Sequence, residues 1–331
     1  MRKYLLPQKG KFYKANLHCH TTFSDGNMTP QEIKDEYTAH GYSVVAFTDH
    51  DLMILHEELN DDKFLALTGF EIEAYVGEKY DPIHKCAHLC FVALDPDNKT
   101  QPFSYPNKFE QVHKERLCYG ESTPRVSREY TPECVNYMIK LGRKAGFFIT
   151  YNHPAWSRET AREISRYEGM HAMEIFNYGC WEAGYPEYNA KDFDALLQDG
   201  RKIYAIAADD NHRRGRDTCG GWVMIKAEKL EYRTITRALE AGDFYASWGP
   251  EIKELWFEDG KLHVICSDAV RITCNHRYRR GQAVYAPEGK TINEAVFEIP
   301  REYGFVRVTI VDAKGRCADS NAYYTEDLYA E

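Results

Sequence analysis

Short apolar stretches alternate with amphipathic stretches along the first 250 residues of the chain. The apolar stretches are continuous and rich in β-branched side chains, and they occupy residues 43–50, 64–74, 85–94, 146–154, 171–178 and 201–212. Continuous apolar runs of this length are typical of strands that a parallel sheet buries on both faces. We therefore predict that these six stretches are strands of an α/β fold.

The amphipathic stretches between the strands begin and end with helix signals. Residues 29–41 start with Thr29 and Pro30, carry Glu32 three positions after the threonine, and end at Gly41. These are the marks of a capping box, a first-turn proline and a C-terminal glycine. A closing glycine also marks three further stretches, residues 131–146, 191–200 and 230–242. The alternation of strand and helix predicts an α/β barrel or a doubly wound sheet.

Two regions depart from this alternation. Residues from about 95 to 131 are polar and rich in Pro, Asn and Ser, which predicts an insertion over one end of the barrel. Long insertions often serve as lids or binding loops, and a surface excursion without function is an equal alternative. After residue 250 the pattern changes to short alternating strands with turn signals at Asp259-Gly260 and Lys314-Gly315. We predict two domains, an α/β domain over residues 1–250 and a small antiparallel β unit over residues 251–331.

Composition and charge narrow the range of partners. The chain of 331 residues carries a net charge of −9 and shows no basic stripe of the kind that a duplex-binding surface needs. It has no run of the roughly 20 apolar residues that a membrane-spanning helix requires. The first ten residues contain only a Leu-Leu pair as an apolar element, so no signal peptide is expected. We expect a cytoplasmic protein that acts on a small anionic molecule, without a stable nucleic-acid or membrane partner.

The ten cysteines are scattered, and no CxxC pair occurs. Without a secretory signal, reduced thiols are the expectation. Cys86 and Cys90 bracket His88 in the sequence KCAHLC, which raises the possibility of a zinc knuckle. The spacing differs from that of a knuckle, and no matching second pair exists. The prediction is therefore that these thiols do not form a zinc knuckle.

Metal-competent side chains gather at the ends of the predicted strands. A further strand is predicted before these six, and His18 and His20 lie near its end. Because they are two residues apart, their side chains point to one face, and Asp25 follows in the loop. Further candidates at strand ends or within strands are His50, Glu71, His88, His153, Asp210 and His212. A single histidine at a strand end is more often structural. It is much less credible that six histidines and three carboxylates at the same end of successive strands are all structural. In α/β barrels the C-terminal ends of the strands carry the active site, so these side chains are expected to converge.

The ordered motifs HxH-TxxSDG, TDH, GxE, a strand histidine, NHP and DxH resemble the PHP family, named for polymerase and histidinol phosphatase. The resemblance covers residues from about 12 to 250. Within the family, EAGDFYASWGPEI and the β-rich end resemble the standalone metallohydrolase branch that includes carbaryl-hydrolase-like proteins. The resemblance implies a distorted (β/α)7 TIM-like barrel with two to three divalent metal ions. Histidine and carboxylate ligands suit Zn, Mn or Fe, and the absence of thiolates argues against a structural zinc site.

The resemblance also divides the nine candidates into ligand groups. The groups are His18, His20, Glu71 and Asp210; Glu71, His88 and His153; and Asp25, His50 and His212. The usual Gly-Ser before the last pair is replaced here by Ala208-Asp209. Asp209 is therefore expected to be either a neighbour of the ligands or a surface residue.

Clustered cations lower the pKa of a bound water, so the expected attacking group is a metal-bound hydroxide, with no separate protein nucleophile. The most favoured activity is a phosphoesterase (EC 3.1) acting on a small phosphomonoester or phosphodiester. Arg158, Arg213 and Arg214 are candidate substrate-binding residues, because guanidinium groups match phosphate oxygens. A metal-dependent hydrolase of a carboxyl ester, carbamate or amide is the alternative. A non-catalytic metal or ligand-binding barrel is a second alternative.

Overall fold

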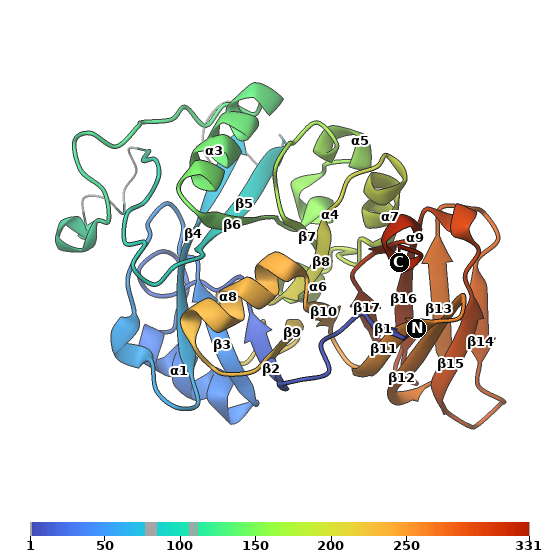
Figure 1. The fold of residues 1–331 in the computed structure, drawn as a ribbon. Coiled ribbons are helices and arrows are strands. Elements are labelled where there is room, and N and C mark those ends of the chain that lie inside the picture. Colours follow the sequence, from blue (N-terminus) through green and yellow to red (C-terminus); the bar gives the residue numbers. More distant parts are fainter. Residues whose placement is uncertain (1, 77–84, 106–108, 110–111, 331) are drawn as a thin grey trace.

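The computed structural model describes residues 2–76, 85–105, 109 and 112–330 (Figure 1). The first half of the chain forms β1 (Lys3–Tyr4), β2 (Lys11–Asn16), α1 (Pro30–Ala39), β3 (Tyr42–Phe47), the 3-10 helix η1 (Glu57–Leu59), β4 (Leu65–Tyr75), β5 (Cys86–Ala93), the 3-10 helix η2 (Lys114–Arg116), α3 (Pro132–Lys144), β6 (Phe147–Tyr151), α4 (Pro154–Ser157) and α5 (Ala161–Ile164). The middle of the chain forms β7 (Ala172–Asn177), α6 (Tyr178–Glu182), α7 (Ala190–Gln198), β8 (Tyr204–Ala208), β9 (Trp222–Ala227), α8 (Tyr232–Ala241) and β10 (Phe244–Ser247). The last part forms β11 (Ile252–Glu258), β12 (Lys261–Ala269), β13 (Arg271–His276), β14 (Gln282–Tyr285), β15 (Ile292–Glu298), the 3-10 helix η3 (Arg301–Tyr303), β16 (Phe305–Val311), β17 (Cys317–Ser320), β18 (Tyr323–Tyr324) and α9 (Thr325–Leu328).

The helix signals in the sequence act as expected at α1. The Thr29 side chain accepts a hydrogen bond from the Glu32 backbone N–H, and the Glu32 carboxylate accepts one from the Thr29 N–H at 2.9 Å. This reciprocal arrangement is a capping box, and it satisfies two N–H groups that the first helical turn leaves open. The helix therefore begins at Pro30, as the sequence predicts.

The strands of the α/β part form one large mixed sheet, and this corrects the prediction of a parallel sheet. The order of the sheet is β14-β13-β16-β17-β10-β9-β2-β3-β4-β5-β6-β7-β8. Strands β2, β3 and β4 are parallel, and so are β6, β7 and β8, but β5 runs antiparallel to both β4 and β6. Strand β9 also pairs antiparallel with β2. Buried apolar runs carry no direction, so the sequence could not distinguish these pairings.

The α/β class is confirmed, but a closed (β/α)7 barrel is not. In the described part of the chain, β8 forms the end of the sheet, and no ladder joins it to β9 or β2. The seam between β8 and the residues after β2 contains a single parallel bridge, between Cys19 and Asn211. Hydrogen bonds also cross it, from the Asp210 N–H to the His18 carbonyl at 3.0 Å, from the Asp209 N–H to Asn16 Oδ1 at 3.0 Å and from Asn211 Nδ2 to the His20 carbonyl at 3.1 Å. The sheet therefore curves into an open barrel in which the β8 end returns to the residues after β2, where the candidate metal ligands lie.

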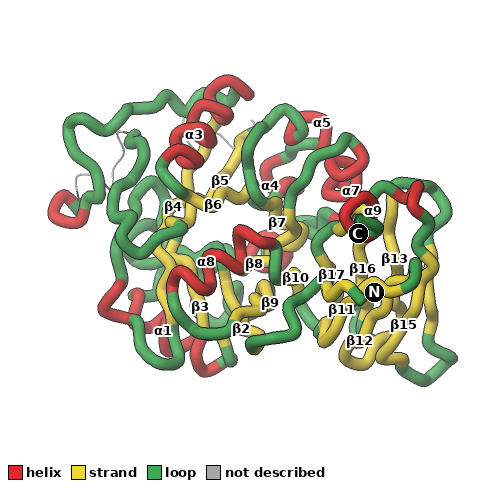
Figure 2. The backbone as a smooth tube through the Cα atoms, viewed as in Figure 1, coloured by secondary structure: helices red, strands yellow, loops and turns green. Residues whose placement is uncertain are grey.

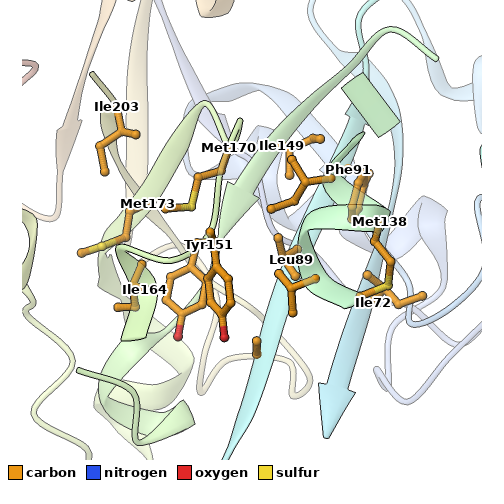
Figure 3. Close-up of a cluster of buried hydrophobic side chains, with 14 of the residues drawn as sticks. Ile72, Leu89, Phe91, Met138, Ile149, Tyr151, Ile164, Met170, Met173 and Ile203 are labelled. Carbon is orange, nitrogen blue, oxygen red and sulfur yellow. The ribbon is translucent and has the colours of Figure 1, made fainter. Parts of the chain in front are cut away.

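Both faces of the central strands are covered, and the two faces differ. The outer face packs on α3, α5 and α7 through a large apolar cluster, part of which is shown in Figure 3. Leu89 and Phe91 of β5 and Ile149 and Tyr151 of β6 all belong to it. Because side chains alternate along a strand, the residues between them point to the opposite, concave face. That alternation places His88 on the inner face of the curved sheet.

The C-terminal region is rich in strands and poor in helices (Figure 2). This region contains a second sheet, of order β1-β11-β12-β15, which packs against the strands of the large sheet. The two sheets enclose a separate apolar core that includes Leu262, Val264, Val306 and Val308. The large sheet runs on into this region, because β10 pairs with β17. Strand β1 comes from the N-terminus, so this layer is built from both ends of the chain. The domain boundary between residues 250 and 251 stays a prediction.

The insertion after β5 packs over the loop that follows β3. The Gln101 side chain accepts a hydrogen bond from the Met53 N–H at 2.8 Å and donates one to the Asp51 carbonyl at 3.0 Å. The buried Arg128 pairs with Asp51 and lies 3.5 Å from Glu73. Residues 77–84, 106–108 and 110–111 lie outside the described residues. Among the described helices, none has the length and apolar character needed to cross a bilayer.

Candidate metal centre

The structure brings the nine predicted metal ligands together at one end of the curved sheet. They form three adjoining groups in which the donor atoms lie within 4.8 Å of one another. The groups are His18, His20 and Asp210; Glu71, His88 and His153; and His20, Asp25, His50 and His212. These groups differ from the sets that the family resemblance implies in two members, because Glu71 is not in the first group and His20 also belongs to the third.

The innermost group lies just beyond the end of β2. The two Nε2 atoms of His18 and His20 are 3.1 Å apart, and both face the Asp210 carboxylate, at 3.2 and 3.1 Å from Oδ1. Cys19 points to the other side and packs in an apolar cluster with α1. Two imidazole nitrogens and a carboxylate oxygen that converge on one point form a donor set for a divalent cation.

Glu71 lies at the centre and connects all three groups. Its Oε1 atom is 3.2 Å from His18 Nε2, 3.1 Å from His88 Nδ1 and 3.5 Å from His153 Nε2. Its Oε2 atom is 3.2 Å from His50 Nδ1. A carboxylate with one oxygen toward each of two clusters of nitrogens is suited to bridge two cations.

The third group is the most open to solvent. The Asp25 carboxylate lies 3.4 Å from His212 Nε2 and 3.6 Å from His50 Nε2. Asp25 and His212 have side chains that are 39% and 33% exposed, whereas His18 and Glu71 are 1% exposed. The solvent exposure of the centre therefore increases from the buried residues at its floor to the accessible residues at its mouth.

Two of the ligands have a backbone conformation that non-glycine residues rarely adopt. His153 directly follows the turn after β6 with a φ of 30°, and Asp210 follows β8 with a φ of 53°. Positive φ values cost free energy, and they persist where the surroundings hold them, often at functional sites. His88 is placed differently. Because β5 is antiparallel to its neighbours, the start of this strand, rather than its end, reaches the same rim.

Charge within the centre keeps the carboxylates ionised. Burial raises the pKa of Glu71, but His18, His88 and His50 outweigh it, so the pKa of Glu71 lies well below its usual value. Burial lowers the pKa of His50 to about 4, with the neighbouring His20 acting in the same direction. Burial also lowers the pKa of His18, but Asp210 and Glu71 reverse this and raise it well above its usual value. Metal ligation requires neutral imidazoles and ionised carboxylates, so the protons held by this carboxylate-rich cluster are those that a cation would displace.

Three buried residues that the motifs did not reveal as site residues hold the ligands in place. Glu174 accepts a hydrogen bond from His18 Nδ1 at 2.8 Å and another from the His153 N–H at 2.8 Å. Asn152 donates to Glu71 Oε1 at 2.9 Å. Glu73 Oε2 lies 3.2 Å from His88 Nε2. Glu174 had a signal in the sequence, because a carboxylate within an apolar strand must have a buried partner.

The role of Asp209, left open by the sequence, is settled by its contacts. It is fully buried and accepts hydrogen bonds from the N–H groups of Cys219, Gly220 and Gly221 at 2.7–2.8 Å. Its Oδ2 atom also accepts one from the Tyr37 hydroxyl at 2.8 Å. Burial raises the pKa of Asp209 to about 6. Asp209 therefore holds the loop after the ligand pair and is not a surface residue.

A cavity of about 580 Å³ opens onto the centre. Seven of the nine donors line it, with His18 and His20 behind them. Arg213 lines it as predicted, and so does Arg216, which the sequence reasoning missed. The other two candidates are not among its lining residues. Arg158 lies over the Tyr185 ring at 5.5 Å, and Arg214 lies 3.5 Å from Glu36.

Comparison with known proteins finds a domain match over part of the chain. Residues 16–157 match the PHP domain model, in agreement with the resemblance predicted from the ordered motifs. No curated protein sequence matches the chain. The placement in the carbaryl-hydrolase-like branch stays a prediction.

Among solved structures, the chain is similar to a two-domain protein from Bacteroides vulgatus containing a predicted PHP-like metal-dependent phosphoesterase, at 14% identity and a TM-score of 0.47, with 97% of each chain covered. An amidohydrolase from Chromobacterium violaceum has 17% identity and a TM-score of 0.41, covering 70% of this chain and 96% of its own. A lesion-specific endonuclease from Pyrococcus furiosus has 13% identity and a TM-score of 0.40, covering 69% of this chain and 56% of its own.

Proposed function

We propose that this chain, in which residues 16–157 form a PHP domain, is a metal-dependent phosphoesterase for a small phosphomonoester or phosphodiester. The observation that carries the proposal is the set of three adjoining donor groups joined by Glu71 at the floor of one cavity. Histidine nitrogens and carboxylate oxygens suit Zn, Mn or Fe, and the proposal is that two to three such ions bind. Bound there, such ions supply Lewis-acid activation of water and neutralise charge on the substrate oxygens.

The charge of the cavity supports a metal-dependent rather than a metal-free anion site. Two arginines, Arg213 and Arg216, line it together with six carboxylates, namely Asp25, Glu71, Glu73, Glu182, Asp210 and Asp217. Four histidines line it as well, and bound cations would displace the protons that they hold. Two or three divalent cations would outweigh the excess of carboxylates, so an anionic substrate is expected to bind more tightly to the metal-loaded protein.

The residues of the chain have distinct tasks in this proposal. Arg213 and Arg216 bind and orient the phosphate oxygens at the mouth, where a guanidinium can make two parallel hydrogen bonds. Asp217 holds that loop, because its carboxylate accepts the backbone N–H groups of His212 at 3.1 Å and Arg213 at 2.8 Å. The Trp156 ring packs edge-on against His88 and His153, with ring centroids 5.1 and 4.9 Å apart, and shields these ligands from water.

Hydrolysis assays with the purified chain test the proposal. The protein is supplied with Mn, Fe or Zn and offered matched aryl phosphates and aryl carboxylic esters. Turnover of the phosphates is the expected result. Turnover of the esters alone would favour the carboxyl ester, carbamate or amide hydrolase, and activity on neither with metal tightly bound would favour a binding protein.

Arginine variants connect the activity to this cavity. Arg216→Ala is expected to raise KM for an aryl phosphate by about 10- to 100-fold, because a charge-assisted hydrogen bond contributes about 1.5–3 kcal/mol. Arg158→Ala is the matched control, since Arg158 does not line the cavity, and its KM is expected to stay unchanged. Equal effects of both substitutions would contradict the assignment of the phosphate-binding mouth.

A further inference from the structure

A cysteine lies at the floor of the metal centre, among residues assigned to the ligand groups. Cys90 is fully buried on β5 and lies directly opposite Glu71 on the neighbouring strand β4. It is two residues from His88, so both side chains point to the inner face of the curved sheet. Leu89 and Phe91, on either side of it, belong to the apolar cluster of the outer face (Figure 3). The sulfur therefore faces the centre and not the hydrophobic core.

The sulfur atom is close enough to other donors to share a cation with them. Cys90 forms a donor group with His18 and Glu71 in which the ligand atoms lie within 4.8 Å of one another. Zinc lies about 2.3 Å from a thiolate sulfur and about 2.0–2.2 Å from nitrogen or oxygen donors, so donors this close fit a common ion. Cys86, which also brackets His88 in the sequence, is in no such group within the described residues.

The orientation of a neighbouring amide supports a role for the sulfur as an electron-pair donor. The Thr150 hydroxyl donates to Asn152 Oδ1 at 2.8 Å, which fixes the two ends of the amide. Asn152 Nδ2 then donates both to Glu71 Oε1 at 2.9 Å and to Cys90 Sγ at 3.1 Å. One amide thus directs its N–H groups at the central bridging carboxylate and at the sulfur. Hydrogen bonds of this kind orient metal ligands and tune their affinity.

His18 is also fixed in the tautomer that this group requires. Its Nδ1–H donates to the Glu174 carboxylate, so in the neutral imidazole the lone pair is on Nε2, which lies 3.2 Å from Glu71 Oε1. The nitrogen, the carboxylate oxygen and the sulfur all belong to buried side chains, so each is held in one place. The set is therefore preorganised, with Glu71 lining the cavity and His18 behind it.

We propose, on the basis of the proposed function, that Cys90 is a thiolate ligand of the innermost metal ion, together with His18 and Glu71. Ligation replaces the thiol proton by the metal, and the proton is released to solvent. A sulfur ligand makes this position softer than a purely histidine and carboxylate site, so it selects zinc or iron(II) over manganese or magnesium. The expectation from the sequence that thiolates are absent from the centre is revised accordingly.

Cobalt(II) substitution tests the ligand directly, because a cobalt–thiolate bond gives a charge-transfer band in the near ultraviolet that nitrogen and oxygen ligands do not. Titration of the full chain with cobalt is expected to produce this band. The band is expected to be lost in Cys90→Ser and kept in Cys180→Ser. Cys180 is the matched control, since it is a buried thiol whose sulfur lies 3.9 Å from Asp210 Oδ2 but in no donor group of the described residues.

Metal affinities provide a second measurement. Cys90→Ser is expected to weaken zinc binding by at least the roughly 10- to 100-fold that loss of a supporting residue costs, with a smaller change for manganese. If Cys90→Ser fails to fold, X-ray absorption of the zinc-loaded wild-type chain decides the question, with a sulfur scatterer expected at about 2.3 Å.

A cobalt-loaded, phosphatase-active protein without the band, or a band that survives in Cys90→Ser, would overturn the role of Cys90 and leave the proposed function intact. Tight metal binding with the band but without hydrolysis would support the Cys90 ligand and refute the phosphoesterase. Failure to bind any of these metals would overturn both.

Discussion

Replacement of Glu174 by glutamine tests whether a buried carboxylate outside the ligand set controls the metal centre. The Glu174 carboxylate accepts hydrogen bonds from three donors, His18 Nδ1, the His153 N–H and Asn177 Nδ2, each at 2.8 Å. Two of these donors belong to candidate metal ligands, His18 and His153. Glu174→Gln keeps the shape of the side chain but replaces one accepting oxygen by an NH2 group, which can only donate.

Either orientation of the new amide is unfavourable. If its NH2 group faces His18, the imidazole must carry its proton on Nε2, and that nitrogen can no longer bind a cation. If the NH2 group faces His153 instead, the buried N–H groups of His153 and Asn177 lose their acceptor, at about 1–3 kcal/mol each. Loss of such supporting hydrogen bonds lowers metal affinity by about 10- to 100-fold, equivalent to about 1.4–2.7 kcal/mol.

Metal affinity is measured by competition with a chromophoric chelator, and the free energy of unfolding of the metal-free protein is measured in urea. The matched control is Glu187→Gln. The Glu187 carboxylate is also buried and accepts backbone N–H groups, from Ala155 at 3.1 Å and Trp156 at 2.8 Å, but within the described part of the chain it has no hydrogen bond to a candidate ligand side chain. Both variants are expected to lose stability, and only Glu174→Gln is expected to lose metal affinity. Metal affinity within about twofold of the wild type in Glu174→Gln would refute the reasoning.

Three further predictions concern the metal and the architecture. His18→Ala or Asp210→Ala is expected to abolish turnover and to leave the circular dichroism unchanged, since neither residue belongs to the apolar clusters. An inactive variant with its full metal content would contradict the assignment. Chelation is expected to abolish turnover and readdition of metal to restore it, so turnover that persists in verified metal-free protein would count against the mechanism. Arg307→Met is expected to lower the free energy of unfolding in urea by about 3–5 kcal/mol. The reason is that Arg307 is buried 2.9 Å from Asp194 and 2.8 Å from Asp319, and its loss leaves Asp319 as an uncompensated buried charge. A loss below about 1 kcal/mol would show that the pair is not important for stability.

Most of the candidate metal centre could be predicted because its ligands lie near strand ends, where short motifs reveal them. His18 and His20 are a clear case, since two-residue spacing sends both side chains to one face whatever the strand pairs with. His88 is harder, because its place at the centre depends on the direction of β5. That direction is set by the pairing of β5 with β4 and β6, and a buried apolar run is the same in either direction.

The residues around the ligands were less predictable, for a geometric reason. Arg158 is close to His153 in sequence, but the short helix α4 ends at Arg158 with a φ of 61°, and the side chain lies over Tyr185. Arg216 is further along its loop from His212, yet it lines the cavity. In a loop, closeness to a ligand in the sequence therefore says little about whether a side chain points toward the cavity. In a strand, the alternation of side chains predicts this well. The same alternation could have identified Cys90, two residues from His88.

The closure of the barrel could not be read from local pattern, and its actual form bears on the function. The β8 end of the sheet meets the residues after β2 through the Cys19–Asn211 bridge and the hydrogen bond from the Asp210 N–H to the His18 carbonyl, so the seam passes through the candidate ligands themselves. A ladder of several residues along this seam would restrict the backbone to extended conformations. A single bridge leaves room for Asp210 to adopt its positive φ, which turns its carboxylate toward His18 and His20. The incomplete barrel is therefore consistent with the geometry of the metal centre, because the strand that would close it ends where its aspartate must face inward.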